Sequence, residues 1–302
     1  MLRSTKFELT DPKRLLILTC IYNRLPLVRE CVEAVLKNTK TTNLNVTFGL
    51  VYNYPPEPDV WNYLVSLIQR PARIIKTIIL DPHENLGCHR GFNYGYKHLN
   101  APAPDYVVKL DDDTIVPPGW NLPMMQLLDD DPSLAFISSV DTEARQGGAF
   151  DSGNFRSEKI GKYHIEIPLR SNVGFSCVMF PKRTLEKFGL MIDSKTLYGG
   201  EEGDYHQRVK AAGQYGAYIR EVTAQHLKND DRDIDYVAWK YWYGYMRATH
   251  LDLRGFKNDR RELIRCWEHM LTRKESWWQQ QARKRLRELK GGFFKRLFNH
   301  NK

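Results

Sequence analysis

The first half of the chain alternates short apolar runs with segments in which apolar side chains recur every three to four residues. Short apolar runs are typical of buried strands, and the second spacing is typical of helices that pack on a sheet. Strands are predicted at residues 14–21, 44–52, 74–80 and 106–110, and helices at residues 27–37, 60–69 and 91–99. This alternation predicts an α/β protein with a mostly parallel, Rossmann-like sheet flanked by helices.

The second half of the chain is less regular. The pattern predicts strands at residues 172–180 and 215–222, helices at residues 184–188 and 202–212, and a loop at residues 141–154. After residue 235 the chain becomes aromatic and helical. We therefore expect an α/β domain over residues 1–232 and a helical, basic and aromatic C-terminal extension over residues 233–302.

Composition bears on the compartment. The 302-residue chain is 42% hydrophobic and 27% charged, as ordinary globular proteins are. Its five cysteines are scattered and form no C-x-x-C pair, which argues against a disulfide framework or a zinc knuckle and indicates a reducing compartment. We find no apolar signal sequence and no apolar run of the roughly 20 residues that a spanning helix needs. These features favour a cytoplasmic protein.

The positive charge is concentrated in the last thirty residues. Residues 273–302 contain ten Lys or Arg and two acids, so they hold +8 of the net charge of +9, and the first 272 residues hold +1. Trp278, Ala282, Leu286 and Leu289 form an apolar helical stripe among these basic residues. Such a helix favours peripheral docking on an anionic membrane surface. The alternative is a solvated helix that packs on the α/β domain through its stripe. Nucleic-acid binding is not expected, because no recognised module is present.

Three carboxylates, Asp111, Asp112 and Asp113, follow the predicted strand at residues 106–110. Ligands of parallel α/β sheets bind beyond the carboxyl ends of the strands, where residues 22–24 and Asn53 are also expected. Adjacent carboxylates repel one another, and a hard divalent cation such as Mg²⁺ or Mn²⁺ relieves that repulsion. The alternative is a solvated acidic turn.

A second set of polar residues lies near the predicted helix at residues 202–212. Glu201, Glu202 and Asp204 open this helix, with Arg208 one turn later, and His226 follows the next strand. Acids at a helix start are favoured by the helix dipole, so capping is one interpretation and a general base at the metal site is the other. A single histidine is more often a structural residue than a ligand.

The segment at residues 85–95 contains Asn85, Gly87, Arg90, Gly91 and Gly95. Its glycines allow the backbone to approach a ligand closely, or allow a helix to pack tightly on the sheet. The spacing matches neither the phosphate-binding loop nor the dinucleotide-binding fingerprint.

Taken in order, these segments resemble the family 2 inverting glycosyltransferases with the GT-A fold. The resemblance rests on TCIYNR (19–24), ENLGCHRGFNYGY (84–96), KLDDD (109–113), SNVGFSCVMFPKRTLEKFG (171–189) and GGEEGDYHQR (199–208), with His226 behind them. Residues 241–251 (YWYGYMRATHL) resemble the helix that follows the catalytic domain in bacterial rhamnosyl- and galactofuranosyl-type members.

The resemblance implies a role for each matching position. Asp113 and His226 would bind the metal, and Glu202 would be the general base, although Glu201 is left as an alternative because the family commonly has Asp there. Phe175, Asp204 and Arg208 would lie on the acceptor side. The nucleotide-sugar would contact the following residues: Asn23, Arg24, Asn53, Asn85, Gly87, Arg90, Asp111 and Asp112.

The activity implied is metal-dependent, inverting transfer of a hexosyl-type sugar, with Mn²⁺ or Mg²⁺ as cofactor. The donor would be a nucleotide-diphosphate sugar and the acceptor a glycan or a lipid-linked hydroxyl, as in polysaccharide biosynthesis. Asn53 stands where the family often has an acid that reads the base, so the nucleotide stays open. A nucleotidyltransferase and a non-catalytic nucleotide-sugar-binding module are the alternatives. The former would need a basic phosphate loop near the N-terminus, and the latter would not need the acid set.

Overall fold

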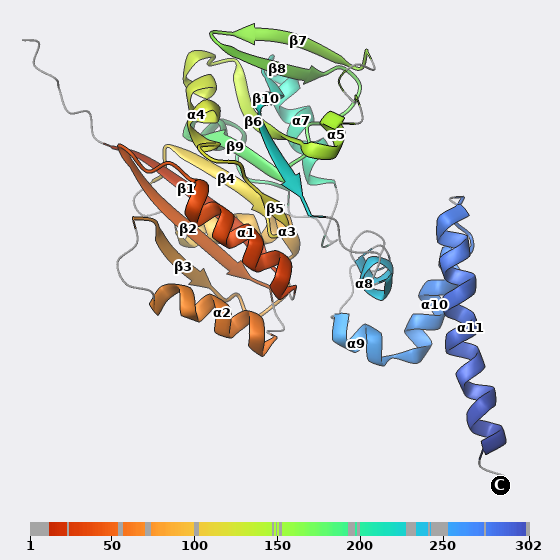
Figure 1. The fold of residues 1–302 in the computed structure, drawn as a ribbon. Coiled ribbons are helices and arrows are strands. Elements are labelled where there is room, and N and C mark those ends of the chain that lie inside the picture. Colours follow the sequence, from red (N-terminus) through yellow and green to blue (C-terminus); the bar gives the residue numbers. More distant parts are fainter. Residues whose placement is uncertain are drawn as a thin grey trace, which may run out of the picture. The chain divides into compact units, whose positions relative to one another are not determined.

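A computed structural model describes residues 12–22, 24–53, 57–69, 74–99, 103–146, 148, 150, 153–192, 197, 200–227, 234–240, 242, 253–274 and 276–299. The chain divides into two compact units (Figure 1). The first comprises residues 1–193 and 200–227, and the second comprises residues 194–199 and 228–302.

The first unit contains one mixed sheet (Figure 1). Its described strands are β1 (Lys13–Ile21), β2 (Leu44–Tyr52), β3 (Lys76–Leu80), β4 (Tyr106–Asp111), β5 (Thr114–Ile115), β6 (Leu134–Asp141), β7 (Phe155–Ile160), β8 (Tyr163–Pro168), β9 (Cys177–Pro181) and β10 (Tyr215–His226). They follow the order β3-β2-β1-β4-β9-β6-β10-β8-β7, and β5 pairs with the end of β10. The described helices of this unit are α1 (Leu25–Asn38), α2 (Pro58–Gln69), α3 (Gly87–His98), α4 (Asn121–Asp130), α5 (Thr142–Gln146), α6 (Lys182–Phe188) and α7 (Glu201–Ala211).

The first four strands of the chain, β1 to β4, form the parallel half of the sheet. β1 pairs in parallel with β2 and β4, and β2 pairs in parallel with β3. The β-α-β alternation from β1 to β4 is therefore the one that the hydrophobic pattern predicts. β9 runs antiparallel between β4 and β6, and the antiparallel hairpin of β7 and β8 extends the sheet beyond β10.

Several elements differ from the expectation. The sequence analysis assigned no strand to β6, β7 or β8, and it expected a loop where α5 forms. The strand expected at residues 172–180 is confined to β9, and β10 continues through residue 226, which places His226 inside the strand.

The two faces of the sheet carry separate apolar clusters because successive side chains of a strand point to opposite faces. On one face Val28, Val32 and Val35 of α1 are completely buried in the larger cluster. On the other face α3 lies very close to the sheet, since a Cβ placed at Gly95 would lie 2.9 Å from side-chain atoms of Leu18. Gly95 therefore allows close packing of α3 on the sheet.

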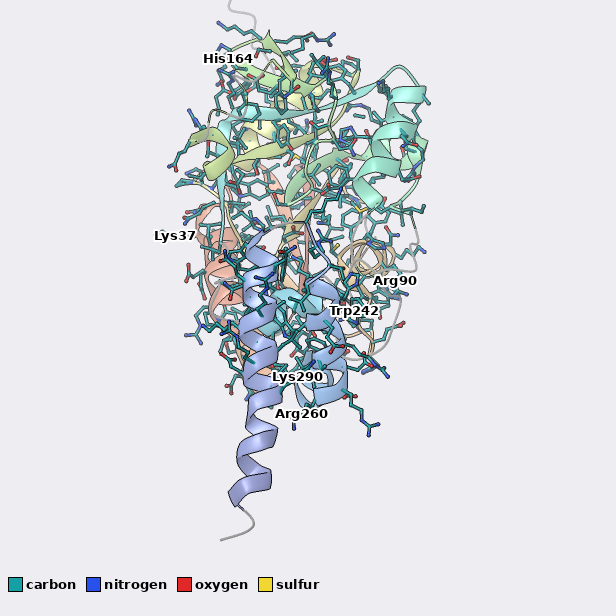
Figure 2. All side chains as sticks on the ribbon, turned by 90° about the vertical axis from the view of Figure 1, so that its right-hand side faces the viewer. Lys37, Arg90, His164, Trp242, Arg260 and Lys290 are labelled. Atoms are coloured by element: carbon teal, nitrogen blue, oxygen red, sulfur yellow. The ribbon has the colours of Figure 1, made fainter. Side chains whose placement is uncertain are left out.

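The second unit is helical in its described part, with α8 (Ile234–Trp239), α9 (Leu253–Asn258), α10 (Arg260–Met270) and α11 (Ser276–Asn299). Three residues of the stripe predicted on α11, namely Trp278, Ala282 and Leu286, are buried, and Leu289 is half-buried. The centroid of the Trp278 ring lies 6.3 Å from that of the Trp267 ring on α10. Arg260 donates to the carbonyl of Leu289, and Lys290 pairs with an acid of α10 (Figure 2). The stripe therefore packs against α10.

Among the helices in the described ranges, none is long and apolar enough to cross a membrane. The five cysteines all lie in described positions, and no two are joined in a disulfide.

Candidate metal centre and its surroundings

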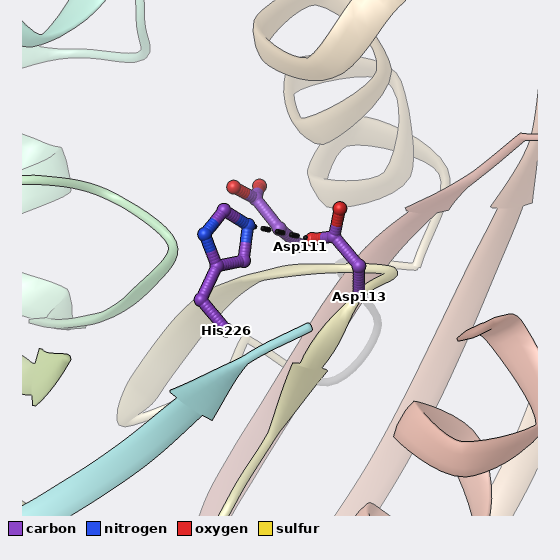
Figure 3. A group of neighbouring side chains, drawn as sticks. All are labelled: Asp111, Asp113 and His226. Atoms are coloured by element: carbon purple, nitrogen blue, oxygen red, sulfur yellow. Dashed lines mark hydrogen bonds and ion pairs between the residues drawn. The ribbon is translucent and has the colours of Figure 1, made fainter. Parts of the chain in front are cut away.

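Two carboxylates and one imidazole meet beyond the carboxyl end of β4. Asp111 ends β4, Asp113 lies in the following turn, and His226 ends β10. Their candidate ligand atoms all lie within 4.8 Å of one another. Figure 3 shows these three side chains gathered together. His226 Nε2 lies 2.9 Å from Asp113 Oδ1.

The short strand β5 brings His226 to the aspartates. Thr114 of β5 pairs antiparallel with His226, and the backbone N–H of Leu227 donates to the carbonyl of Asp113 at 2.7 Å. These backbone hydrogen bonds thus join the segment that carries Asp113 directly to the segment that carries His226. A histidine that follows the third aspartate by 113 residues in the chain becomes its neighbour through this pairing.

Positive side chains compensate the aspartate run. Arg24, which precedes α1, contacts Asp112 Oδ1 and lies 3.0 Å from Asp113 Oδ2. Lys109 Nζ lies 2.6 Å from Asp111 Oδ1. Each carboxylate of the run therefore has a cationic partner from the protein, which offsets the mutual repulsion expected from the sequence.

Asp112 is not part of the grouped set of candidate ligands and has hydrogen-bonding partners of its own. Its side chain is 6% exposed and accepts a hydrogen bond from the backbone N–H of Tyr22 at 2.9 Å. Burial raises the pKa of this carboxyl, and the nearby Arg24 guanidinium opposes that shift. Asp112 thereby ties the turn after β4 to the segment after β1, and its expected contact with the nucleotide-sugar stays a prediction.

The ligand set fits a hard divalent cation. Carboxylate oxygens are preferred by Mg²⁺ and Mn²⁺, and imidazole is a common ligand of transition metals. Asp113 is 3% exposed, and a buried carboxylate charge is unfavourable unless a cation lies beside it. The hydrogen bond to Asp113 raises the pKa of His226, and a metal would have to replace the proton that this interaction favours.

Glu202 is the second residue of α7, which begins directly after the left-handed Gly200 (φ 91°). Its Oε1 accepts the backbone N–H of Phe175 at 2.9 Å. It therefore does not act only as a helix cap. Glu201 is the first residue of the same helix, and its side chain lies outside the described part of the structure.

Three consecutive backbone N–H groups, at residues 173–175, all donate to side chains. Val173 donates to His206 Nε2 at 2.7 Å, Gly174 to Tyr218 Oη at 2.6 Å and Phe175 to Glu202. Burial lowers the pKa of His206 to about 4, which keeps Nε2 deprotonated and able to accept. The sequence analysis missed His206, although it lies one helical turn after Glu202.

The residues expected on the acceptor side have structural contacts of their own. The ring of Phe175 is 1% exposed and packs against Phe136 at 5.3 Å, so it lines no open surface. The expected place of Phe175 on the acceptor side stays a prediction, which would rest on its backbone groups. Asp204 pairs with Arg208 at 2.6 Å, and Arg208 also donates to the carbonyl of Leu190 at 3.1 Å. This pair holds the segment that follows α6.

Residues expected to bind the nucleotide-sugar shape the turn that leads into α3. Asn53 is 4% exposed, and its Oδ1 accepts the N–H of Leu86 at 3.1 Å. Asn85 Oδ1 accepts the N–H of Gly87 at 2.9 Å, where φ is 69°. Arg90 (labelled in Figure 2) donates from Nε to the carbonyl of Leu86 at 3.1 Å. A donor would therefore meet a turn that these side chains have already shaped. Asn23 lies outside the described residues.

The fold and the ligand set together define a class of protein. The sequence model of the family described as "Glycosyl transferase family 2" matches residues 16–188, which is more than half of the chain. The chain belongs to this family. The match ends before α7 and before His226, so it includes two of the three candidate metal ligands. No curated protein sequence matches the chain significantly.

Solved structures of glycosyltransferases share the fold, which is GT-A. "GalNAc-T7 with UDP, GalNAc and Mn2+" superposes with a TM-score of 0.56 and 11% identity over 72% of this chain. The match spans 43% of that protein, less than half of its length. "Mannosyltransferase PcManGT from Pyrobaculum calidifontis in complex with GDP-Man and Mn2+" superposes with a TM-score of 0.56 and 14% identity, over 91% of this chain and 74% of that chain.

Proposed function

We propose that this chain is a metal-dependent, inverting glycosyltransferase that moves a hexosyl-type sugar from a nucleotide-diphosphate donor to an acceptor hydroxyl. The observation that carries the proposal is the convergence of Asp111, Asp113 and His226 beyond the carboxyl end of β4. Membership of the family and the Mn²⁺ and nucleotides named for both similar structures support it.

In this proposal Asp113 and His226 hold Mn²⁺ or Mg²⁺, and Asp111 lies beside them. A bound divalent cation supplies positive charge where the diphosphate leaving group becomes more negative. The imidazole adds a nitrogen ligand to the oxygen set, which favours Mn²⁺ of the two ions. The nucleotide-sugar lies against residues 22–24 and the turn before α3, where Arg24 and Arg90 bring positive charge.

Glu202 is the general base of the proposed reaction. Its carboxylate removes the proton of the acceptor hydroxyl while that oxygen attacks the anomeric carbon from the face opposite the diphosphate. One displacement of this kind inverts the configuration. The hydrogen bond from the N–H of Phe175 fixes the orientation of the carboxylate.

The acceptor in this proposal is a glycan or a lipid-linked hydroxyl, as in polysaccharide biosynthesis. Support for a lipid-linked acceptor comes from α11, where Arg283, Lys284 and Arg287 are exposed. We propose that these residues meet an anionic surface on the cytoplasmic side of a membrane. The proposed relation to rhamnosyl- and galactofuranosyl-type enzymes rests on residues 241–251, of which only residue 242 is described.

Release of nucleoside diphosphate from UDP-, GDP- and dTDP-linked sugars, with and without Mn²⁺ and candidate acceptors, tests the activity. The proposal expects one donor to be used in a Mn²⁺-dependent manner. With that donor, Glu202→Gln should lower the transfer rate roughly 100-fold or more, as expected for the loss of a general base. Glu186→Gln, an exposed substitution on α6, is the matched control.

Near-normal transfer by Glu202→Gln together with loss in Glu201→Gln would move the base to Glu201. Nucleotide binding without any turnover would instead support the non-catalytic module.

A further inference from the structure

A lysine lies buried in the middle of the sheet, two residues before the aspartate run. Lys109 is on β4, between Val108 and Leu110, and is 4% exposed. Burying an ammonium group is unfavourable unless charged and polar partners surround it. Its position therefore calls for an explanation beyond packing.

The ammonium of Lys109 connects two parts of the site. Nζ donates to Asp111 Oδ1 at 2.6 Å and to the carbonyl oxygen of Phe175 at 2.9 Å. The backbone N–H of Asp111 donates to the carbonyl of Ser176 at 2.8 Å, so the same two segments are also joined through the main chain. Side chains of residues 109 and 111 point to the same face of β4, because orientation alternates along a strand.

The peptide groups of Phe175 lie between Lys109 and the proposed base. Its carbonyl accepts from Lys109, and its N–H donates to Glu202 Oε1 at 2.9 Å. A continuous chain of contacts thus runs from Asp111 through Lys109 and Phe175 to Glu202. The segment is held from a third direction by Ser138 Oγ, which donates to the carbonyl of Gly174 at 2.7 Å.

We propose that Lys109 is a positioning residue that sets the placement of Glu202 relative to the metal centre. This inference rests on the proposed function for the roles of Asp111 and Glu202. It assigns Lys109 no contact with the substrate. Its physical basis is that a base displaced by about 1 Å from its working geometry loses on the order of 100-fold in rate.

Lys109→Met is a suitable test because the fold should tolerate it. Asp111 has a side chain that is 33% exposed, so water or a metal can solvate it after the lysine is removed. Replacing a buried charge by an apolar side chain of similar length is often neutral for folding when no buried charge is left alone. Removing the ammonium also removes a positive charge near the cation site, so Mn²⁺ should bind at least as tightly as in the wild type.

A matched control exists in the same sheet. Lys13, at the start of β1, also pairs with an aspartate and a second oxygen, namely Asp129 Oδ2 and Tyr106 Oη. It lies at the opposite end of the strands from the aspartate run. Lys13→Met removes a comparable pair of contacts and should leave both activity and metal binding unchanged.

With a donor found in the screen above, Lys109→Met should lower kcat roughly 10- to 100-fold. The KM for the donor should stay near the wild-type value. Lys109→Arg, which keeps the charge and offers several donors, should restore much of the rate. A normal kcat in folded Lys109→Met, or an equal loss in Lys109→Arg and Lys109→Met, would overturn the positioning role.

A second measurement needs no sugar donor. Hydrogen exchange of the peptide that contains residues 173–176 should slow when Mn²⁺ alone is added to the wild type and to Lys13→Met. That protection should be lost in Lys109→Met, even though electron paramagnetic resonance should still show that this variant binds Mn²⁺. Protection that persists in Lys109→Met, or that is absent in the wild type, would contradict the proposal. If no protein turns over any donor, the proposed function fails, and this exchange measurement still decides the role of Lys109.

Discussion

At the scale of single residues, hydrogen-bonding partners distinguish side chains of the same chemical type. Asp111 and Asp113 point toward the candidate metal centre, whereas Asp112 accepts from the N–H of Tyr22 and pairs with Arg24. The sequence showed that three acids follow a strand. It could not show which of them turns inward, because that depends on the backbone of a segment about 90 residues away.

Asp112→Asn should lower the free energy of unfolding more than the loss of one surface charge does. It leaves the Arg24 guanidinium, whose side chain is mostly buried, with a weaker partner. We expect a loss of about 1–3 kcal/mol in the free energy of unfolding, measured by urea denaturation. Asp130→Asn, at an exposed position of α4, is the control and should change stability by no more than about 0.5 kcal/mol. Equal stability of the two variants would argue against the structural role of Asp112.

His206 should make stability depend on pH in a defined window. Its pKa is lowered to about 4 in the folded chain from an ordinary value of 6.5, so the unfolded chain binds the proton first as the pH falls. Stability is then complete above pH 6.5 and declines between pH 6.5 and about 4. At pH 5 the loss attributable to His206 is about 2 kcal/mol at most.

Urea unfolding of wild type and His206→Gln at pH 7 and pH 5 measures this contribution. The glutamine does not titrate, so the variant should lose less stability over the same interval. Identical pH dependence in the two proteins would show that His206 is not the group responsible.

At the scale of elements, the local pattern was a good guide where strand and helix alternate. Strands β1, β2 and β4 follow from apolar runs because they are largely buried on both faces, and β3 is an apolar run that is only half-buried. The helices between them follow from helical spacing. The β7–β8 hairpin was missed because its strands are only half apolar and lie at the edge of the sheet, where one face is exposed. The strand β6 is an apolar run that the sequence analysis left unassigned.

The glycines of α3 illustrate an interaction that the local pattern leaves ambiguous. Gly95→Ala should destabilise the fold by about 1–3 kcal/mol because the new methyl group would lie 2.9 Å from Leu18 and Val51. Gly203→Ala on α7, where the nearest atom would be 3.4 Å away, should be neutral or stabilising by up to about 1 kcal/mol. Thermal unfolding of both variants tests the comparison, and a stabilised Gly95→Ala would mean that α3 does not pack as closely as described.

At the scale of the whole molecule, the chain combines an almost neutral part with a strongly basic terminus. Pairing of β5 with β10 brings residues 111–113 and 226 together, and this long-range step is what turns separate motifs into one candidate centre. The order of the motifs along the sequence indicated these residues through a family resemblance. It could not give the distances between their side chains. The apolar stripe of α11, by contrast, was identified from its spacing, while its partner α10 was not.

Because the stripe is buried against α10, binding to a membrane would have to use the exposed basic face of α11. We expect the full-length protein to co-sediment with vesicles that contain phosphatidylglycerol, and to be released as salt is raised. Each basic residue near the surface contributes about 1 kcal/mol, so the variant Arg283→Glu/Lys284→Glu/Arg287→Glu should bind at least on the order of 100-fold more weakly. The same reversal at Arg156, Lys159 and Lys162, on the β7–β8 hairpin, is the control. Equal binding by both variants would remove α11 as the contact surface.

The central claim is that Asp113 and His226 hold the metal on which sugar transfer depends. The most direct test measures Mn²⁺ binding by electron paramagnetic resonance, and Mn²⁺-dependent release of nucleoside diphosphate, in wild type and Asp113→Asn. We expect the substitution to weaken Mn²⁺ binding by at least about tenfold and to abolish metal-dependent release, since one ligand loses its charge. Unchanged Mn²⁺ affinity in a folded Asp113→Asn protein, with turnover intact, would contradict the account.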